Sequence, residues 1–368
     1  MFDRRLITHF NWPILIVALV LAMMGLANLY SATSTFDPGE QTSYFRAQLV
    51  WLTIGISSLL VVFSIHYRHF RALSYVFYGI TAVLLLLVLV VGRKVAGHQS
   101  WLQIGPVSLQ PTEIAKLGLI FGLSRYLSVF RPSPKGATFR ELIPPFLFFL
   151  LPTGLVILQG DLGSSLFFGL IFGTLILIYG VRWQVLVSML VLFVVVATLA
   201  YFFFLSPYQK NRILTFLNPE MDRRGSGYHL IQSKIAVGSG GWMGKGYLKG
   251  KTHKLKFIPE RHTDFIFTVL AEEWGFLGSG MILGLFGLLL FLGISVAVRA
   301  NDRFSFFLSV GVCALFFWHL VVNLGGVLGL MPLTGVPLPF FSYGGSALMT
   351  NWIGIGLLLN VSMRRFMF

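Results

Sequence analysis

Long apolar runs alternate with short polar segments along almost the whole chain. A transmembrane helix needs roughly 20 consecutive apolar residues, and ten runs approach or reach that length. They are too long for strands and lack the period-two alternation of a membrane β-barrel. The pattern predicts an all-α integral membrane protein with about ten transmembrane helices, built as a single polytopic membrane domain over residues 1–368. The runs cover residues 11–31, 48–66, 71–92, 113–130, 142–159, 163–181, 184–205, 274–298, 304–330 and 346–363.

The composition fits a protein whose solvent is largely lipid. Of the 368 residues, 56% are hydrophobic and only 11% are charged. A soluble domain carries about 25% charged residues to wet its surface. A length that would otherwise suggest two or three soluble domains therefore describes one membrane bundle here.

Basic residues gather on one side of the predicted bundle. With ten spans both termini lie on one side, and thirteen of the 28 lysines and arginines lie there in the termini and short loops. The short loops of the opposite side carry only Arg46, Arg93 and Lys94. Because short cytoplasmic loops are enriched in Lys and Arg, we expect both termini to be cytoplasmic.

The long loop over residues 206–263 is the exception to this rule. It would lie outside the membrane, yet it carries eleven lysines and arginines. Either the topology is inverted, or the loop is basic because it meets an anionic ligand such as a lipid phosphate. A merely solvated charged loop is a further explanation. We favour the anionic ligand, because the short loops are asymmetric throughout the chain.

Two features stand out within the long loop. Apolar residues over 228–237 recur at helical spacing around Gln232 and Lys234, which predicts a short helix at the membrane surface. A glycine-rich stretch over 238–246 follows. It matches no nucleotide-binding fingerprint, because it follows a helix rather than a strand. Its amides and Lys245 can still face an anion.

Charged residues at membrane depth are costly, so each one is a candidate for function. Glu113 and Lys116 lie on one helix face at the start of the fourth run, where they can pair. The pair either fixes this helix or holds a polar substrate. Asp161 lies in a tight turn over 159–163, where it is either a helix cap or a residue facing the outer side.

A polar cluster leads into the eighth run. Glu260, Arg261, His262 and Asp264 precede an apolar stretch directly, which places Asp264 at the outer membrane interface. Cationic neighbours there favour an ionised carboxylate, and an ionised carboxylate can accept a proton from a hydroxyl group. The alternative is that Asp264 caps the eighth helix.

Irregular backbone is predicted before the tenth run. Residues 335–346 contain two prolines and a Gly-Gly pair. Such backbone is tolerated at this depth only when it is buried in protein or lines a cavity, so we expect an outward-facing substrate cavity here. In the ninth run, His319 and Asn323 share one face and predict hydrogen bonds between helices rather than catalysis.

Four stretches carry a resemblance to a known family. They read GYHLIQSKIAVGSGG from Gly227, PERHTDFIF from Pro259, VLAEEWG from Val269 and GVPLPFFSYGGSA from Gly335. Together they resemble the SEDS family (shape, elongation, division and sporulation), and the likeness covers essentially the whole chain. Arg261 and the pair Tyr228-His229 favour the elongation branch. The chain departs from the family pattern at Ser100 and near Ser108, where many relatives carry basic residues.

The resemblance implies a peptidoglycan glycosyltransferase that polymerises lipid II during cell elongation. In this family the acceptor's 4-hydroxyl attacks the anomeric carbon of the donor, undecaprenyl diphosphate leaves, and the configuration inverts. Asp264 matches the family's general base. Cations such as Lys245, Arg212 and Lys116 can stabilise the leaving group. A divalent cation, Mg or Mn, can share that task, although the sequence contains no Asp-x-Asp metal motif.

The residues expected to bind substrate come from all these motifs. They are Glu113, Lys116, Asp161, Arg212, His229, Gln232, Lys234, Lys245, Glu260, Arg261, His262, Ser342, Tyr343, Gly344, Gly345 and Ser346.

The resemblance also implies partners and a location. The partners would be lipid II, a class B penicillin-binding protein, other membrane proteins of the elongation complex and membrane lipids, with no nucleic acid. The location would be the bacterial cytoplasmic (inner) membrane, with the active site on the extracytoplasmic face. Two other functions stay open. Intramembrane charges and broken helices also occur in transporters, which leaves a lipid II flippase, and a non-catalytic scaffold of the elongation complex is the third possibility.

Overall fold

The chain folds into a bundle of long helices. The computed structural model describes residues 10–34, 37–95, 98–105, 107–205, 207–222, 226–250 and 262–364. Ten long helices correspond one by one to the predicted runs. They are α2 (Trp12–Thr33), α3 (Pro38–Ser64), α4 (Tyr67–Val91), α5 (Pro111–Val129), α6 (Phe139–Leu158), α7 (Leu162–Tyr179), α8 (Trp183–Leu199), α11 (Ile266–Val298), α12 (Arg303–Leu328) and α13 (Gly345–Arg364).

Within the described residues, nine helices are long and apolar enough to cross a membrane. The remaining long helix is α5, which carries Glu113, Lys116 and Arg125 within its 19 residues. It lies in the middle of the bundle and most of its residues are buried. The prediction of an all-α, multi-pass membrane protein with about ten helices is confirmed.

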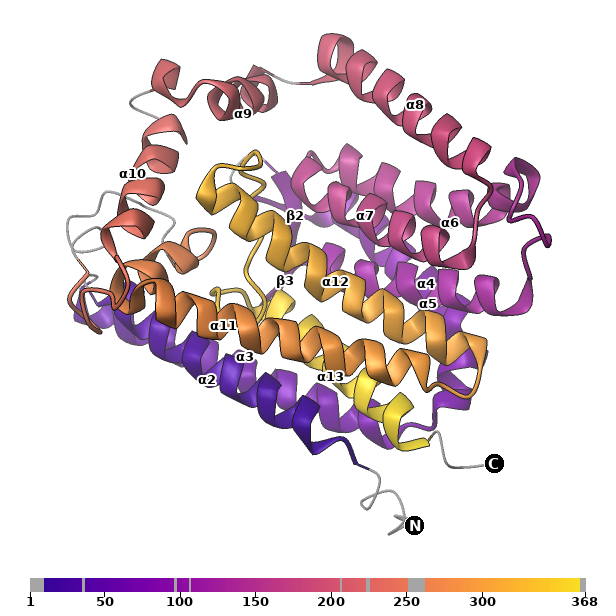
Figure 1. Cartoon of the computed structure of the whole chain (residues 1–368), viewed down its shortest axis with the longest axis horizontal. Helices are drawn as coiled ribbons and strands as arrows, with labels where there is room; N and C mark the ends of the chain where they lie inside the picture. The colour runs from indigo at the N-terminus through magenta and orange to yellow at the C-terminus, as the bar shows by residue number, and fades with distance from the viewer. Residues whose placement is uncertain are drawn as a thin grey trace.

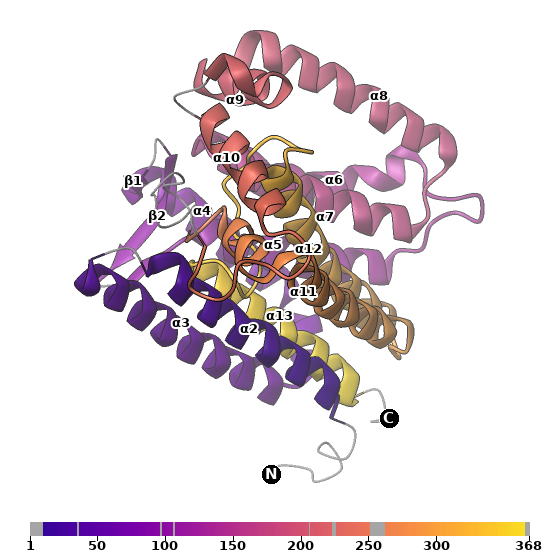
Figure 2. The same ribbon diagram turned by 60° about the vertical axis from the view of Figure 1, so that its left-hand side comes forward.

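The long helices run up and down, so the first turn of α2 and the last turn of α13 lie at one end of the bundle (Figure 1). We name this the terminal end, and the opposite one the loop end. In the apolar 18-residue stretches of α12 and α13, 72% and 89% of the residues are buried, so these two helices form the centre of the bundle. By contrast, α8 has a single buried residue, Val185, and lies apart from the other spans in both views (Figure 2).

Smaller elements lie between the long helices. A three-stranded antiparallel sheet connects α4 to α5. The apolar pattern did not predict it, because strands of three to seven residues leave little periodicity to detect. The predicted short helix over 228–237 is confirmed as α10. These elements are β1 (Arg93–Val95), β2 (His98–Ile104), β3 (Val107–Leu109), the π-helix η1 (Ala200–Phe204), α9 (Pro207–Leu217), the 3-10 helix η2 (Pro219–Asp222) and α10 (Ser226–Ser239).

Two helices begin well before the start of their apolar runs. α3 begins at Pro38 instead of residue 48, and α11 begins at Ile266 instead of residue 274. The extension of α11 contains Glu272 and Glu273, which are buried at 0% and 1% exposure. Their carboxylates have partners inside the protein, so the helix can extend toward its N-terminus beyond the point where the apolar run begins.

The glycine-rich stretch after α10 forms hydrogen bonds with the backbone at a break in α11. Gly275 has φ 64° and ψ −161°, which interrupts the helix. On one side of the break, the amides of Lys245 and Gly246 donate to the carbonyls of Glu272 and Glu273 at 3.0 and 2.9 Å. On the other side, the amides of Phe276 and Leu277 donate to the carbonyls of Gly241 and Trp242 at 2.8 and 3.1 Å. The stretch therefore satisfies backbone groups that the break would leave without partners.

We predict that Gly275→Ala destabilises the protein. A side chain at this φ and ψ costs about 1–3 kcal/mol, and its Cβ would collide with the backbone of Gly244 and Trp242. The melting temperature of the purified protein in detergent should fall. Gly280→Ala is the matched control, because a Cβ at that exposed position of the same helix meets nothing within 4 Å. Equal melting temperatures for the two variants would contradict the account of the break.

Candidate functional site

The irregular segment over residues 329–344 joins α12 to α13 at the loop end, as its prolines and glycines predicted. Phe340 has a positive φ of 64° although it is not a glycine. Such a conformation costs about 1–3 kcal/mol and persists only when its surroundings hold it. Here the ring of Phe340 packs between Phe316 and Trp352, with centroids 5.8 and 5.5 Å away. The segment is therefore held in one shape by the buried core.

Asp264 lies in the turn over residues 262–265, directly before α11. The N-cap position of α11 is Phe265, so Asp264 lies outside the helix. Its side chain is partly exposed, and a Cβ on Gly335 would lie 3.5 Å from its Oδ2 atom. The carboxylate thus faces the irregular segment across a position that has no side chain.

Three consecutive carbonyl groups of this turn accept hydrogen bonds from distant parts of the chain. The donors come from the irregular segment and from α12, so the backbone of Asp264 is fixed on both sides. The pairs are Tyr343 N to His262 O at 2.9 Å, Ser342 Oγ to Thr263 O at 2.6 Å and Asn323 Nδ2 to Asp264 O at 3.0 Å.

Aromatic rings lie beside the turn. Tyr44 lies 4.8 Å from the ring of His262 and 5.1 Å from that of Tyr343. Burial raises the pKa of the Tyr343 hydroxyl, and its neighbour Tyr44 raises it further. The Tyr343 hydroxyl is therefore protonated at neutral pH and able to donate a hydrogen bond. Flat apolar faces next to polar groups suit the faces and hydroxyls of a sugar.

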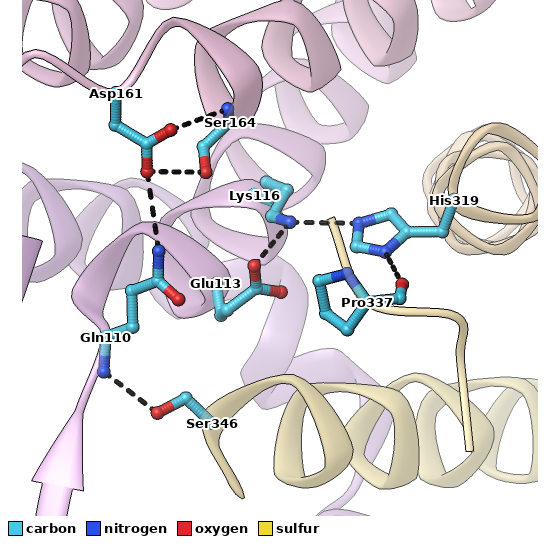
Figure 3. A network of polar contacts seen from close by, with 8 residues as sticks. All are labelled: Gln110, Glu113, Lys116, Asp161, Ser164, His319, Pro337 and Ser346. Atoms are coloured by element: carbon cyan, nitrogen blue, oxygen red, sulfur yellow. Dashed lines mark hydrogen bonds and ion pairs between the residues drawn. The ribbon is translucent and has the colours of Figure 1, made fainter. Parts of the chain in front are cut away.

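A buried polar network surrounds Lys116 (Figure 3). Its ammonium contacts Glu113 Oε1 at 2.8 Å and His319 Nε2 at 2.9 Å, and it lies 4.9 Å from the ring centre of Phe167. Lys116 is 0% exposed and Glu113 is 3% exposed. The predicted ion pair is thus formed, and the ammonium of Lys116 is surrounded by protein groups.

The network continues to the neighbouring helices. Asp161 accepts hydrogen bonds from the backbone and hydroxyl of Ser164 at 2.9 and 2.7 Å, so it caps α7. Gln110 reaches Asp161 through a long contact of 3.4 Å, and its backbone amide donates to Ser346 Oγ at 2.8 Å. The start of α13 is thereby tied to the starts of α5 and α7.

The irregular segment connects this network to the Asp264 turn. His319 Nδ1 lies 3.4 Å from the carbonyl of Pro337, while Asn323, one turn along α12, bonds the next carbonyl back at Val336. Because the ammonium of Lys116 donates to Nε2, the proton of the neutral ring lies on Nδ1 and points toward Pro337. The hydrogen bond predicted between helices is confirmed for His319, which contacts Lys116 on α5. For Asn323 the prediction is wrong, because its amide donates to the Asp264 turn and to the irregular segment instead of to another helix.

The predicted cations differ in their surroundings. Arg212 donates from Nη1 to the carbonyl of Leu333 at 3.3 Å, and the end of the Lys234 side chain lies against Gly329. Both therefore lie on the irregular segment. Lys245 instead pairs with Glu272 at 2.7 Å and donates to Ser239 at the same distance, which places it at the break in α11.

The other predicted residues are more scattered. His229 and Gln232 lie on α10, which Ser233 ties to the carbonyl of Val327 at 2.8 Å. Gly344 ends the irregular segment and Gly345 begins α13, where a Cβ on Gly345 would collide with Trp51. Glu260 and Arg261 lie outside the described residues.

Three polar residues that hold the site were not predicted. Gln48 donates to the carbonyl of Ser342 at 3.3 Å, and Asn28 donates to that of Ile266 at 3.0 Å. Tyr44 contributes its ring. The available signal was a buried amide within an apolar run, which marks a polar contact between helices.

The described residues do not form a resident metal site. Within them, no group of three or more His, Cys, Asp or Glu side chains could hold a metal ion.

Comparison with known proteins places this helical membrane protein in one class. The sequence pattern of the cell cycle protein family that includes FtsW, RodA and SpoVE matches residues 11–366. The chain is 35% identical to the peptidoglycan glycosyltransferase MrdB of Escherichia coli (strain K12), covering 98% of this chain and 95% of that protein.

Solved structures agree. One structure, described as a study of the coordination of polymerisation and crosslinking by a peptidoglycan synthase complex, matches with a TM-score of 0.82 and 35% identity, over 98% of this chain and 99% of that one. The rod shape determining protein RodA of Thermus thermophilus matches with a TM-score of 0.73 and 31% identity, over 98% of both chains.

The chain is therefore a multi-pass membrane enzyme of the peptidoglycan glycosyltransferase class. It belongs to the FtsW, RodA and SpoVE family, which confirms the resemblance drawn from its motifs.

We predict that Lys116→Met destabilises the fold far more than the double variant Glu113→Gln/Lys116→Met. Removing one partner of a buried ion pair costs about 3–5 kcal/mol, because it leaves the other charge uncompensated, whereas replacing both partners is often neutral. Melting temperatures in detergent measure the difference. A double variant as unstable as the single one would show that the two side chains are needed for more than mutual neutralisation.

Proposed function

We propose that this enzyme polymerises lipid II into glycan strands, with Asp264 as the general base. The acceptor's GlcNAc 4-hydroxyl would attack the anomeric carbon of the donor's MurNAc. Asp264 would take the hydroxyl proton while the bond to the diphosphate breaks. Undecaprenyl diphosphate would leave with the bonding electrons, and the configuration at the anomeric carbon would invert.

One observation carries the assignment of the base. Asp264 is a partly exposed carboxylate at the loop end whose backbone is held by α12 and by the irregular segment. A general base must stay within hydrogen-bond reach of the proton that it abstracts. A carboxylate on a fixed backbone, facing a glycine instead of a side chain, leaves room for a sugar hydroxyl to approach.

Arg212 and Lys234 are the best candidates to meet the leaving diphosphate. Both lie against the irregular segment that faces Asp264. The ammonium of Lys116 is fully buried among protein partners, and Lys245 is paired with Glu272. We assign Lys116 and Lys245 to holding the fold and its site, because both pair with buried carboxylates, and we assign Arg212 and Lys234 to the substrate, because both lie against the irregular segment that faces Asp264.

A divalent cation, Mg or Mn, enters this proposal only as a companion of the substrate's own diphosphate. Diphosphates bind such ions through their oxygens, which leaves few positions for the protein to fill. No residue of this chain is assigned as its ligand.

The relatives support a proposal for the biological setting. We propose that the chain lies in the bacterial cytoplasmic (inner) membrane with both termini in the cytoplasm, which puts the loop end and Asp264 outside. One similar structure is described as part of a synthase complex that also crosslinks. This supports a class B penicillin-binding protein as the partner, within the elongation complex and its membrane lipids.

We predict that Asp264→Asn abolishes strand formation from purified lipid II without loss of folding. General-base catalysis contributes about 10²–10⁴-fold, so strands should fall by at least that range on a gel. Asp302→Asn is the control, because Asp302 caps α12 at the terminal end and Asn caps a helix equally well.

The outcome also separates the competing functions. The reaction is run with and without a class B penicillin-binding protein, and with and without divalent cation. Near-normal strands from Asp264→Asn would refute the base assignment. No strands from the unmodified protein under any condition, together with translocation of labelled lipid II in vesicles, would establish a flippase. If the protein gives no strands and no translocation, the scaffold function remains.

We further predict that Arg212→Gln lowers kcat by about 10²-fold, the range for losing one donor to a developing negative charge. Lys210→Gln is the matched control on the same helix, since Lys210 bonds the carbonyl of Phe202 instead of the irregular segment. Equal kcat values for the two variants would remove Arg212 from the leaving-group site.

A further inference from the structure

The side-chain amide of Asn323 joins the two segments that form the site. Its Nδ2 atom donates to the carbonyl of Asp264 at 3.0 Å and to that of Val336 at 2.8 Å. An amide nitrogen carries two hydrogens, so both are used. The reversed amide would turn its oxygen toward two carbonyl oxygens, so the hydrogen bonds themselves determine its orientation.

Asn323 stands on a rigid base. It is 5% exposed and lies on α12, whose apolar window is 72% buried. His319 lies one turn earlier, about 6 Å along the helix axis, and contacts Lys116 and the carbonyl of Pro337. α12 therefore contacts two consecutive carbonyls of the irregular segment, Val336 through Asn323 and Pro337 through His319. Through Asn323 it also holds the Asp264 turn.

We propose that Asn323 is the positioning residue for the Asp264 carboxylate. This inference rests on the proposed function. Asn323 holds the Asp264 backbone next to Val336, which directly follows Gly335, the residue that the carboxylate faces. Without the amide, two carbonyls lose this donor, and the link that holds the turn against the segment is gone. A misplacement of 1 Å can cost about 10²-fold in rate.

The chain supplies a matched control in Asn360 on α13. This amide is 0% exposed, and the two hydrogens of its Nδ2 are shared among the carbonyls of Val62, Phe63 and Ile65 at 2.8, 3.1 and 2.6 Å. It makes the same type of contact as Asn323, but it does so at the terminal end, where it closes the end of α3. Its loss should cost stability without touching the base.

The experiment compares Asn323→Ala, Asn360→Ala and Asp264→Asn in lipid II polymerisation by the full chain with its penicillin-binding partner. Folding is checked by size-exclusion chromatography and melting temperature. We expect Asn323→Ala to lower kcat about 10–100-fold with KM within about twofold. Asn360→Ala should lower the melting temperature comparably and keep kcat within about twofold of the unmodified enzyme.

A purely structural role would lower the two melting temperatures and leave both kcat values alike, which would overturn the inference. Should Asn323→Ala aggregate, Asn323→Ser replaces it, because its hydroxyl can still donate to one carbonyl, and an intermediate kcat is expected. Aggregation of both variants beside a folded Asn360→Ala would also overturn it. Full activity of Asp264→Asn would instead refute the proposed base, so the two failures are distinguishable.

Discussion

Lipid offers no hydrogen bonds, so every backbone N–H and C=O group inside the bundle needs a partner within the protein. This requirement decides where the chain can leave helical geometry. At Gly275 the partners come from the glycine-rich stretch after α10. In the turn before α11 and in the segment after α12 they come from single side chains together with backbone amides such as that of Tyr343. The irregular backbone that makes the site exists only because these donors are in place.

The donors reach the site from helices that are far apart in sequence. Asn28 on α2 holds the first turn of α11, Gln48 on α3 holds the irregular segment, and Asn323 on α12 holds both that segment and the Asp264 turn. Each of these residues is a neutral amide. An amide is far less costly to bury than a charge, and its two hydrogens can connect two carbonyls at once. The bundle therefore positions a carboxylate chiefly by means of uncharged groups.

Much of the fold follows from the sequence, because a run of about 20 apolar residues has few alternatives to a transmembrane helix. Hydropathy missed the first turns of α11, because Glu272 and Glu273 interrupt the apolar pattern there. Each of these carboxylates has a partner in another part of the protein. Hydropathy also missed the small sheet after α4. For the site, Asp264 stood out because a polar cluster meets an apolar run. That Lys245 would face Glu272, or that Ser342 would hold the carbonyl of Thr263, depends on contacts between distant segments that no local pattern contains.

The long helix that fits the rules for a membrane span least well carries a buried ion pair. α5 carries Glu113 and Lys116 in its first two turns, and both are nearly inaccessible. A structural helix gains little from such a pair, since apolar residues of similar volume often serve as well. Here the ammonium also contacts His319, whose other ring nitrogen faces the irregular segment. The ammonium of Lys116 on α5 is thus connected through His319 to the same segment that Asn323 joins to Asp264. The cost of burying this charge is therefore offset by contacts that hold the site in shape.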